Sequence, residues 1–514
     1  MTVRDVSYAL FSGLMLASIF PPFHFSALAW VALVPLLWSL HGKRPHEGFA
    51  LGFLSGLVAY GIIVWWVKLT MVRYGGLHPA LAWLVTLLLV MYLALFPAVF
   101  AWGLIRLCPG RELSVFLLAP PLWVALELLR AHFLSGFPWA LLGYSQYQVP
   151  PVIQIADLTG VYGVSFFIVL GNAAVWHFFR NPHRAPFAVV GGTAVAALLV
   201  LGYGYLRLHE VPRDAGEPSR AVGIVQGNTE QAVKWSPAWQ EAIMGELVRL
   251  TSATAREFQG KRLAAPPLIV WPEAAAPFIY TEQPQWRARM RTAAQDARSY
   301  LLFGSLGLDR EGDEPRLYNS AYLISPEGRE LGRYDKMHLV PFGEYVPLGR
   351  LLFFVQKLVP VIGTFAEGGQ PVIFDAPGGR FGTLICFEVI FPHVVRRLRD
   401  AQFLVNITND AWFGRSAASE QHLSMVALRA VELRVPIVRA ANTGISALID
   451  ARGQIHDRSP LFVPWRKTGL IAPRVTPPTV YARSGDIFAL LCAAAAVAAA
   501  CAGWARRPRR VWYD

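Results

Sequence analysis

Long apolar runs at both ends of this 514-residue chain restrict its fold more than any other feature. A helix that crosses a bilayer needs about 20 mostly apolar residues, and eight runs reach or approach that length, the first two being the shortest. Inside a bilayer the backbone must satisfy its own hydrogen bonds, so such runs are expected to be helices. The sequence therefore predicts a membrane domain of about eight transmembrane helices. The runs are residues 8–20, 28–40, 49–67, 80–105, 113–129, 152–179, 187–206 and 487–504.

The distribution of charge supports this prediction and suggests an orientation. The chain is 54% hydrophobic and only 16% charged, yet its net charge is +13. No nucleic-acid-binding motif is present, so we attribute the positive charge to membrane topology. With the N-terminus in the cytoplasm, the inner loops and the C-terminal tail hold most of the lysine and arginine of the short loops, which predicts cytoplasmic termini. These residues are Lys43, Arg44, Arg106, Arg111, Arg180, Arg184, Arg506, Arg507, Arg509 and Arg510.

The polar region between the seventh and eighth runs is predicted to be a single α/β domain. Short apolar strands alternate there with helix-like segments such as 237–258, 285–298 and 420–434. This alternation favours a sheet covered on both faces over an all-β sandwich. We therefore expect a membrane domain over residues 1–210, an extracytoplasmic domain over 211–480, and a last transmembrane helix with a basic cytoplasmic tail over 481–514.

One cysteine in the polar region is a candidate nucleophile. Cys386 directly follows a predicted buried strand, residues 382–385, whereas Cys108, Cys492 and Cys501 lie in or beside the apolar runs. A strand end is a rigid place to present a thiolate, which is the reactive form of cysteine. Since Cys386 has no partner for a disulfide within the polar region, a catalytic role is the alternative to a small buried side chain.

Two further residues complete a candidate catalytic set. Glu273 follows the predicted strand 268–271, and Lys336 lies in a polar turn. Acyl transfer through a cysteine needs a base for the thiol proton and a positive group at the developing oxyanion. Glutamate and lysine can supply these two functions. Taken alone, each of them is more often a solvated loop residue.

The order of these three residues and their surroundings resemble the nitrilase (carbon–nitrogen hydrolase) superfamily. With the apolar runs included, the whole chain resembles the apolipoprotein N-acyltransferase family within it. Four short motifs add to the resemblance to this family: residues 137–139, 143–145, 225–228 and 234–235. The motifs that carry the superfamily resemblance are residues 271–274, 334–344, 386–388, 406–414 and 439–444.

The resemblance implies a fold and a set of site residues. The fold would be a multi-span helical membrane domain joined to a four-layer αββα sandwich. Glu273, Lys336 and Cys386 would form the catalytic triad. The supporting or substrate-binding residues would be Glu344, Glu388, Trp235 and Phe387, the last standing where tyrosine also occurs in the family. No His/Cys cluster has metal-ligand spacing, so we expect neither a metal nor another cofactor.

The resemblance also implies a reaction and its partners. Cys386 would take the sn-1 acyl chain of a membrane phospholipid as a thioester. The α-amine of the diacylglyceryl-cysteine of an apolipoprotein would then accept the acyl chain as an amide. The protein would be a multi-pass bacterial inner-membrane enzyme, with its catalytic domain on the periplasmic face. We expect it to act as a monomer without nucleic acid.

Two other functions remain open at this stage. A membrane-tethered amidase of the nitrilase type would share the triad but would not need so many transmembrane helices. A transporter or receptor would carry ionisable residues or broken helices near the middle of the bilayer. Here the few charges near the runs, Lys68 and Glu127, lie toward their ends.

Overall fold

The computed structural model describes residues 1–108, 112–180, 186–210, 219–310, 314–345 and 365–505. Arg111, Arg184 and the four tail arginines of the predicted inner loops lie outside these residues. The chain forms two compact units, and each is described by itself. A helical unit contains residues Met1–Trp65, Trp83–Arg207 and Ser484–Asp514, and a sandwich unit contains residues Trp66–Ala82 and Leu208–Arg483.

Five helices among the described residues are long and apolar enough to cross a membrane. The other predicted runs contain shorter elements: α1 has 16 residues, the run 28–40 holds a 3-10 turn and the six-residue α2, and the apolar part of α17 is shorter than the five. The count of eight therefore stays a prediction. The main helices are α1 (Val3–Ser18), α2 (Val34–Ser39), α3 (Pro45–Ile63), α5 (Pro79–Leu107), α6 (Glu112–His132), α9 (Val161–Arg180), α10 (Pro186–Glu210) and α17 (Ile487–Ala505).

Two apolar runs are broken by local backbone geometry. In the run 28–40, the 3-10 turn η1 (Ser26–Trp30) is separated from α2, and Asn172 of α9 satisfies both sides of the break. Its amide donates to the Ala29 carbonyl and accepts from the Leu33 N–H, each at 2.8 Å. In the run 152–179, Gly160 has a φ of 67° and ends the short α8 (Ala156–Thr159) before α9 begins. Broken backbone at membrane depth needs such internal partners.

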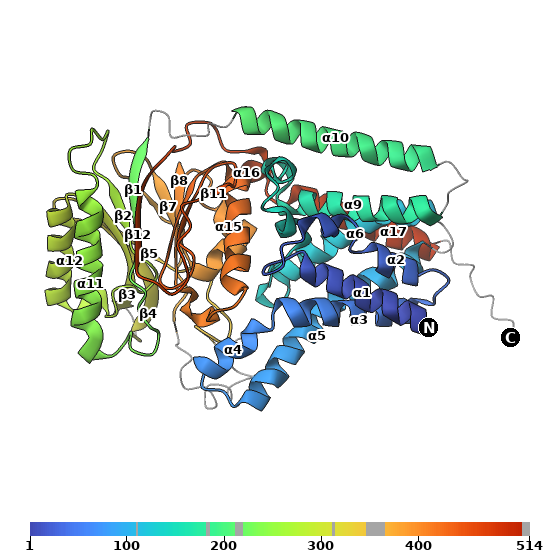
Figure 1. Cartoon of the computed structure of the whole chain (residues 1–514), viewed down its shortest axis with the longest axis horizontal. Coiled ribbons are helices and arrows are strands. Elements are labelled where there is room, and N and C mark those ends of the chain that lie inside the picture. The colour runs from blue at the N-terminus through green and yellow to red at the C-terminus, as the bar shows by residue number, and fades with distance from the viewer. Residues whose placement is uncertain (109–111, 181–185, 211–218, 311–313, 346–364, 506–514) are drawn as a thin grey trace. The chain divides into compact units, whose positions relative to one another are not determined.

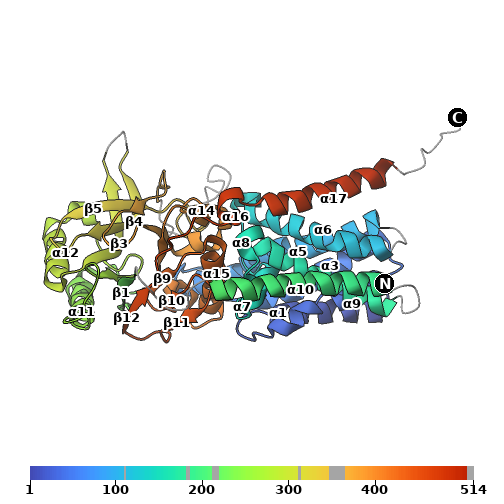
Figure 2. The same cartoon turned by 90° about the horizontal axis from the view of Figure 1, so that it is seen from above.

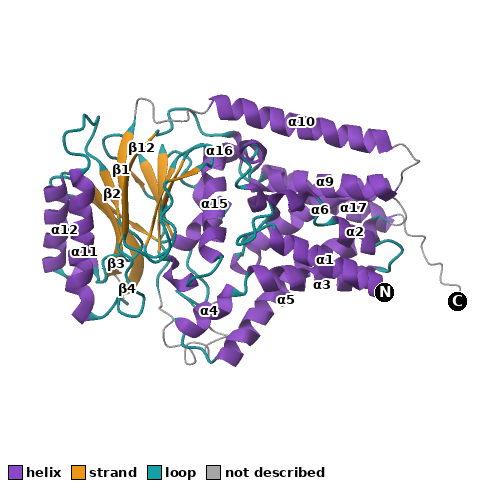
Figure 3. Cartoon of the chain, viewed as in Figure 1, coloured by secondary structure: helices purple, strands orange, loops and turns teal. Residues whose placement is uncertain are grey.

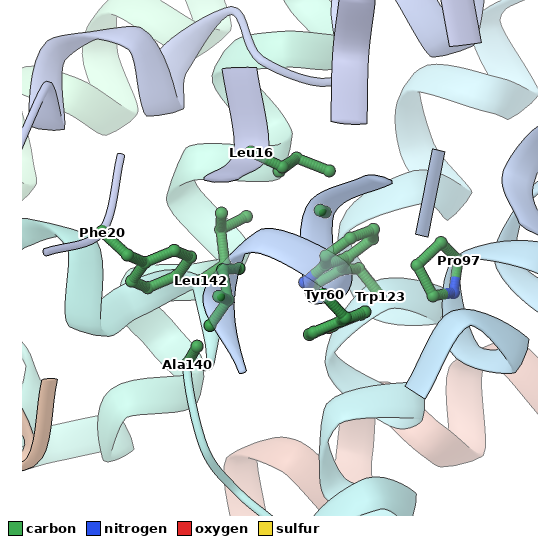
Figure 4. A pocket seen from close by; sticks show the side chains of 9 residues that line it. Leu16, Phe20, Tyr60, Pro97, Trp123, Ala140 and Leu142 are labelled. Atoms are coloured by element: carbon green, nitrogen blue, oxygen red, sulfur yellow. The ribbon is translucent and has the colours of Figure 1, made fainter. Parts of the chain in front are cut away.

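Small residues let the helices of this unit approach closely. A Cβ at Gly52 or Gly56 of α3 would collide with the backbone of α5 around Ala94 and Pro97. Figure 2 shows α3, α6, α9 and α17 running with similar axes. The apolar pocket between the helices holds only about 20 Å³, room for roughly one water molecule. Figure 4 shows its lining residues, which include Leu16, Phe20, Tyr60, Pro97, Trp123, Ala140 and Leu142.

The sandwich unit contains two six-stranded sheets. In the first, the order β12-β1-β2-β3-β4-β5 places three parallel strands, β1 to β3, beside antiparallel neighbours. Its strands are β1 (Arg220–Gln226), β2 (Leu268–Val270), β3 (Tyr300–Asp309), β4 (Arg316–Ile324), β5 (Glu330–Asp335) and β12 (Trp465–Ile471). The second has the order β11-β10-β9-β8-β7-β6, with β7 to β9 parallel. Its strands are β6 (Ile373–Phe374), β7 (Phe381–Ile385), β8 (Phe403–Thr408), β9 (Ile437–Ala441), β10 (Ala447–Ile449) and β11 (Ile455–His456).

The two sheets face each other and carry helices on their outer sides, as Figures 1 and 3 show. The helices α11 (Pro237–Arg256) and α12 (Pro284–Ala297) cover the first sheet, and α15 (Ala418–Leu433) covers the second. The alternation of strands and helices predicted a sheet covered on both faces, and each of the two sheets is covered by helices on one face and by the other sheet on the second, as in the αββα sandwich that the resemblance implied. A strand that is buried on both faces has a nearly continuous apolar sequence, whether a helix or a second sheet covers it.

A segment from the N-terminal part of the chain belongs to the sandwich unit. The helix α4 (Trp66–Arg73) packs against the short η6 (Asp410–Phe413) after β8. The Trp66 ring lies 4.8 Å from that of Phe413, and the Thr70 hydroxyl donates to the Trp412 carbonyl at 2.8 Å. Lys68 therefore belongs to the sandwich unit and not to a membrane-spanning helix.

Candidate active site

Cys386 lies where β7 ends and the 3-10 turn η5 (Cys386–Ile390) begins. Its φ of 53° is in the left-handed region, which is uncommon for residues other than glycine. Non-glycine residues in this region store strain and persist only where surrounding contacts hold them. The side chain is buried, as predicted for a residue at the end of a core strand.

Glu388 supplies the contacts that hold this turn. Its fully buried carboxylate accepts the Ile385 N–H at 2.7 Å, just before the cysteine. It also accepts the N–H groups of Met337 and His338, at 2.7 and 3.1 Å, and the Tyr334 hydroxyl at 2.7 Å. Burial raises the pKa of Glu388, and these donors oppose that effect. Glu388 thus ties the cysteine turn to the segment that carries Lys336.

Lys336 follows β5 directly and lies between two carboxylates. Its Nζ is 2.8 Å from Glu344 Oε2 and 3.7 Å from Glu273 Oε1, and its side chain is only 1% exposed. Burial disfavours the charge, but Glu344 and Glu273 outweigh it and raise the pKa of Lys336. Lys336 is therefore a buried cation at neutral pH. Glu344 also accepts the Val340 N–H at 2.8 Å, which orients it.

Asn319 of β4 joins the two carboxylates, and no sequence motif indicated it. Its side-chain amide donates to Glu273 Oε1 at 2.7 Å and to Glu344 Oε1 at 3.0 Å. Asn409, which follows β8, donates its N–H to Glu273 Oε2 at 2.8 Å. Both oxygens of Glu273 are thus oriented by donors from the two facing sheets. Only the pairing of distant strands could reveal this arrangement.

Lys234 is a second buried lysine at the site. Its Nζ donates to the Glu273 carbonyl at 3.2 Å, and the residue is 1% exposed. Burial lowers the pKa of Lys234 to about 8, against the opposing charges of Glu273 and Cys386. The sequence comparison pointed to Lys234 only as part of a motif with Trp235. The Trp235 side chain is 42% exposed.

A buried ion pair also lies near the thiol. Asp410 accepts from Arg439 Nη2 at 2.9 Å and lies 3.2 Å from His422 Nδ1, all three being buried. Burial raises the pKa of Asp410, but Arg439 and His422 outweigh this and lower it to about 2. Thr408 hydrogen-bonds to Asp410 and also contacts the Cys386 side chain. This cluster fixes the loop after β8 beside the cysteine.

These surroundings set the protonation state of Cys386, the candidate nucleophile. Burial raises the pKa of the Cys386 thiol, the Glu273 charge raises it further, and Lys336 acts in the opposite direction. The resting residue is therefore a thiol at neutral pH, and a base must take its proton when it attacks. Glu273 is the carboxylate that both sheets orient at this place. Phe387 instead points to an aromatic cluster, with its ring 5.1 Å from that of Phe391.

Comparison with known proteins shows the family to which the chain belongs. Residues 12–174 match the family model described as apolipoprotein N-acyltransferase N-terminal domain, and residues 221–482 match the carbon–nitrogen hydrolase model. An apolipoprotein N-acyltransferase from Geobacter metallireducens is 44% identical over 98% of this chain and 96% of its own length. The chain belongs to the apolipoprotein N-acyltransferase family.

Further members of the apolipoprotein N-acyltransferase family are similar over most of the chain. The relative from Methylococcus capsulatus is 34% identical over 96% of this chain and 95% of its own length. A solved amidase of the nitrilase superfamily from Nesterenkonia AN1 is 18% identical, covers 53% of this chain and 95% of its own, and has a TM-score of 0.39. The family resemblance and the nitrilase-like fold predicted from sequence motifs are thus confirmed by the family models and the relatives.

Proposed function

We propose that this chain transfers the sn-1 acyl chain of a membrane phospholipid to the N-terminal diacylglyceryl-cysteine of an apolipoprotein. The observation that carries the proposal is the buried set of Glu273, Lys336 and Glu344 beside the thiol of Cys386. It contains a base, an oxyanion-stabilising cation and a nucleophile, which are the groups that acyl transfer needs. Membership of the apolipoprotein N-acyltransferase family supports the choice of substrates.

In the first half-reaction, Glu273 takes the Sγ proton of Cys386 as sulfur attacks the sn-1 ester carbonyl. The developing oxyanion is stabilised by the Lys336 ammonium, which Glu344 holds in place. The C–O bond then breaks, and Glu273 returns the proton to the glyceryl oxygen of the departing lysophospholipid. The enzyme is left as a thioester at Cys386.

In the second half-reaction, the neutral α-amine of the acceptor attacks the thioester carbonyl. A C–N bond forms, the C–S bond breaks, and Glu273 transfers the amine proton to sulfur. The product is an amide and the thiol is regenerated. Since water would compete with the amine, a buried site favours acyl transfer over hydrolysis.

The proposal includes a location and an organisation. The protein would lie in the bacterial inner membrane with about eight transmembrane helices, and residues 211–480 would face the periplasm. Domain limits of 1–210, 211–480 and 481–514, cytoplasmic termini and a monomeric state are parts of this proposal. The alternative of a membrane-tethered amidase is not favoured, because the relatives match along nearly the whole chain, including its apolar N-terminal part.

The test is to follow a radiolabelled sn-1 acyl chain through both half-reactions. Without an acceptor, the purified enzyme should become labelled at Cys386, and neutral hydroxylamine should release the label as expected for a thioester. A diacylglyceryl-cysteine peptide with a free amine should discharge the enzyme, whereas an N-acetylated peptide should not. Lys336→Met should slow labelling by about 10²–10³, the usual effect of losing one oxyanion donor.

Two results would contradict the mechanism. Label on Cys386→Ala would exclude Cys386 as the acyl carrier. Acyl transfer by the wild-type enzyme without any labelled intermediate would favour direct transfer between the two lipids. Release of ammonia from a small amide at a rate above acyl transfer would instead support the amidase.

A further inference from the structure

The sandwich unit contains a pocket that the proposed triad does not use. It encloses about 260 Å³, close to the lower limit of about 300 Å³ for small-molecule sites. One wall is α4 and the chain after it, and the other is the loop after β8. The lining residues are Lys68, Leu69, Val72, Arg73, Tyr74, Pro79, Trp412, Gly414 and Arg415.

Specific contacts hold the two walls together. The Thr70 hydroxyl donates to the Trp412 carbonyl at 2.8 Å, and the Tyr74 and Trp412 rings meet edge to face at 5.4 Å. The Trp66 indole N–H donates to the Gln421 side chain at 3.3 Å. Because side chains from both walls bond across the junction, the pocket is a built feature of this unit.

The pocket is lined by three cations, Lys68, Arg73 and Arg415. The Arg73 guanidinium lies 5.7 Å from the Tyr74 ring, and that of Arg415 lies 4.8 Å from the Phe462 ring. Stacking on an aromatic face leaves the in-plane N–H groups of a guanidinium able to bind a phosphate in bidentate geometry. Glu230 also acts on Tyr74, so a carboxylate lies near this end of the pocket as well. This lining fits a ligand with a single negative phosphate.

The position of the pocket along the chain connects it to the active site. Trp412 comes three residues after Asn409, which donates its N–H to Glu273, and two residues after Asp410, which lies beside Cys386. Three residues span at most about 11 Å, so the pocket wall begins within that reach of the catalytic loop. A ligand held by Arg415 and Trp412 would therefore stand in a defined position relative to the nucleophile.

We propose that this pocket, lined by Lys68, Arg73, Arg415 and Trp412, binds the phosphodiester headgroup of the phospholipid acyl donor. The inference rests on the proposed function and adds the headgroup subsite to it. The phosphate would be held by the arginines while the sn-1 ester is presented to Cys386. The diacylglyceryl acceptor has no phosphate and would not use this subsite.

The test compares two acyl donors with the same labelled sn-1 chain, phosphatidylethanolamine and the neutral diacylglycerol, in detergent micelles with the full-length enzyme. We expect Arg73→Gln and Arg415→Gln each to reduce kcat/KM for Cys386 acylation from phosphatidylethanolamine by about tenfold, since each removes charged hydrogen bonds. Acylation from diacylglycerol should be unchanged, as should discharge of the acyl-enzyme to the acceptor peptide. The matched control is Arg291→Gln, an exposed arginine on α12, which should resemble wild type with both donors.

Equal losses with both donors, or no loss with either, would overturn the proposal. A loss confined to the discharge step would assign the pocket to the acceptor and would also overturn it. If inorganic phosphate altered labelling from diacylglycerol in wild type but not in Arg415→Gln, free phosphate would be the ligand instead. Native mass spectrometry with an uncleavable diether phosphoethanolamine lipid separates this inference from the proposed function. Weaker binding by the two variants would support the subsite even if no acyl-enzyme formed, and unchanged binding would exclude it.

Discussion

The two buried lysines at the site differ in the direction in which their surroundings shift their pKa. Lys336 and Lys234 both contact Glu273 and are both 1% exposed. Lys336 has two carboxylates, which raise its pKa, whereas Lys234 has a carbonyl, and burial lowers its pKa to about 8. Lys336 is thus a permanent cation suited to an oxyanion. The charged form of Lys234 is disfavoured by burial, so it lowers the stability of the folded protein.

This difference predicts a pH-dependent stability for Lys234. The pKa of Lys234 is about 8 in the folded protein against an ordinary 10.5, so between these values the unfolded chain binds a proton that the folded chain does not. Stability must therefore rise with pH across this window, by about 3 kcal/mol at 1.36 kcal/mol per pKa unit. We expect the thermal midpoint of wild type, relative to Lys234→Met, to rise from pH 8 to 10.5.

A matched control makes this measurement specific. Lys261 is exposed in the same unit, so Lys261→Met is the matched control for the loss of a lysine charge. A difference between wild type and Lys234→Met that stays flat over this pH range would contradict the prediction. The readout is calorimetric and does not depend on activity.

At the scale of elements, the site depends on a carboxylate that joins two strand ends. Glu388 accepts N–H groups from the turn after β5 and from the last residue of β7. The strained φ at Cys386 and the position of Lys336 are therefore held by the same group. A change at Glu388 should disturb both elements together.

We predict that Glu388→Gln lowers both stability and labelling. A glutamine amide cannot accept from all these donors, and a buried donor without a partner costs about 1–3 kcal/mol. The thermal midpoint should fall, and the rate of Cys386 acylation should fall with it. Tyr334→Phe is the matched variant, because it removes only the hydroxyl and keeps the backbone donors paired. A Glu388→Gln protein with the midpoint and labelling rate of wild type would contradict this role.

At the scale of the whole molecule, the proposed orientation is testable without any activity. Basic residues in the predicted inner loops predict that both termini lie in the cytoplasm. A reporter that is active only in the periplasm should be silent when fused after Asp514. Fused to a chain truncated at residue 218, it should be active. The opposite pattern would place the catalytic domain in the cytoplasm and remove it from its proposed substrates.

Sequence alone determined the features that depend on local composition. Five of the apolar runs as long helices, the buried strands β2 and β7, and the position of Cys386 at the end of β7 were predicted correctly. Burial of a continuous apolar segment can be predicted from the sequence, because every residue in the segment is apolar. The edge strands β5 and β12 were missed, since exposed edges carry charged residues such as Arg333, Arg466 and Lys467.

Only the tertiary structure decided which of these elements and side chains contact one another. The alternation of strands and helices did not distinguish one sheet from two facing sheets, and α4 joined the sandwich unit through contacts with residues more than 300 positions away. Asn319 and Lys234 reached Glu273 only because strands far apart in the chain are paired. Such contacts leave no periodic pattern in the sequence, because each is made by one isolated polar side chain. The composition of the candidate active site therefore follows from strand pairing, whereas the position of Cys386, its candidate nucleophile, could be predicted from one strand end.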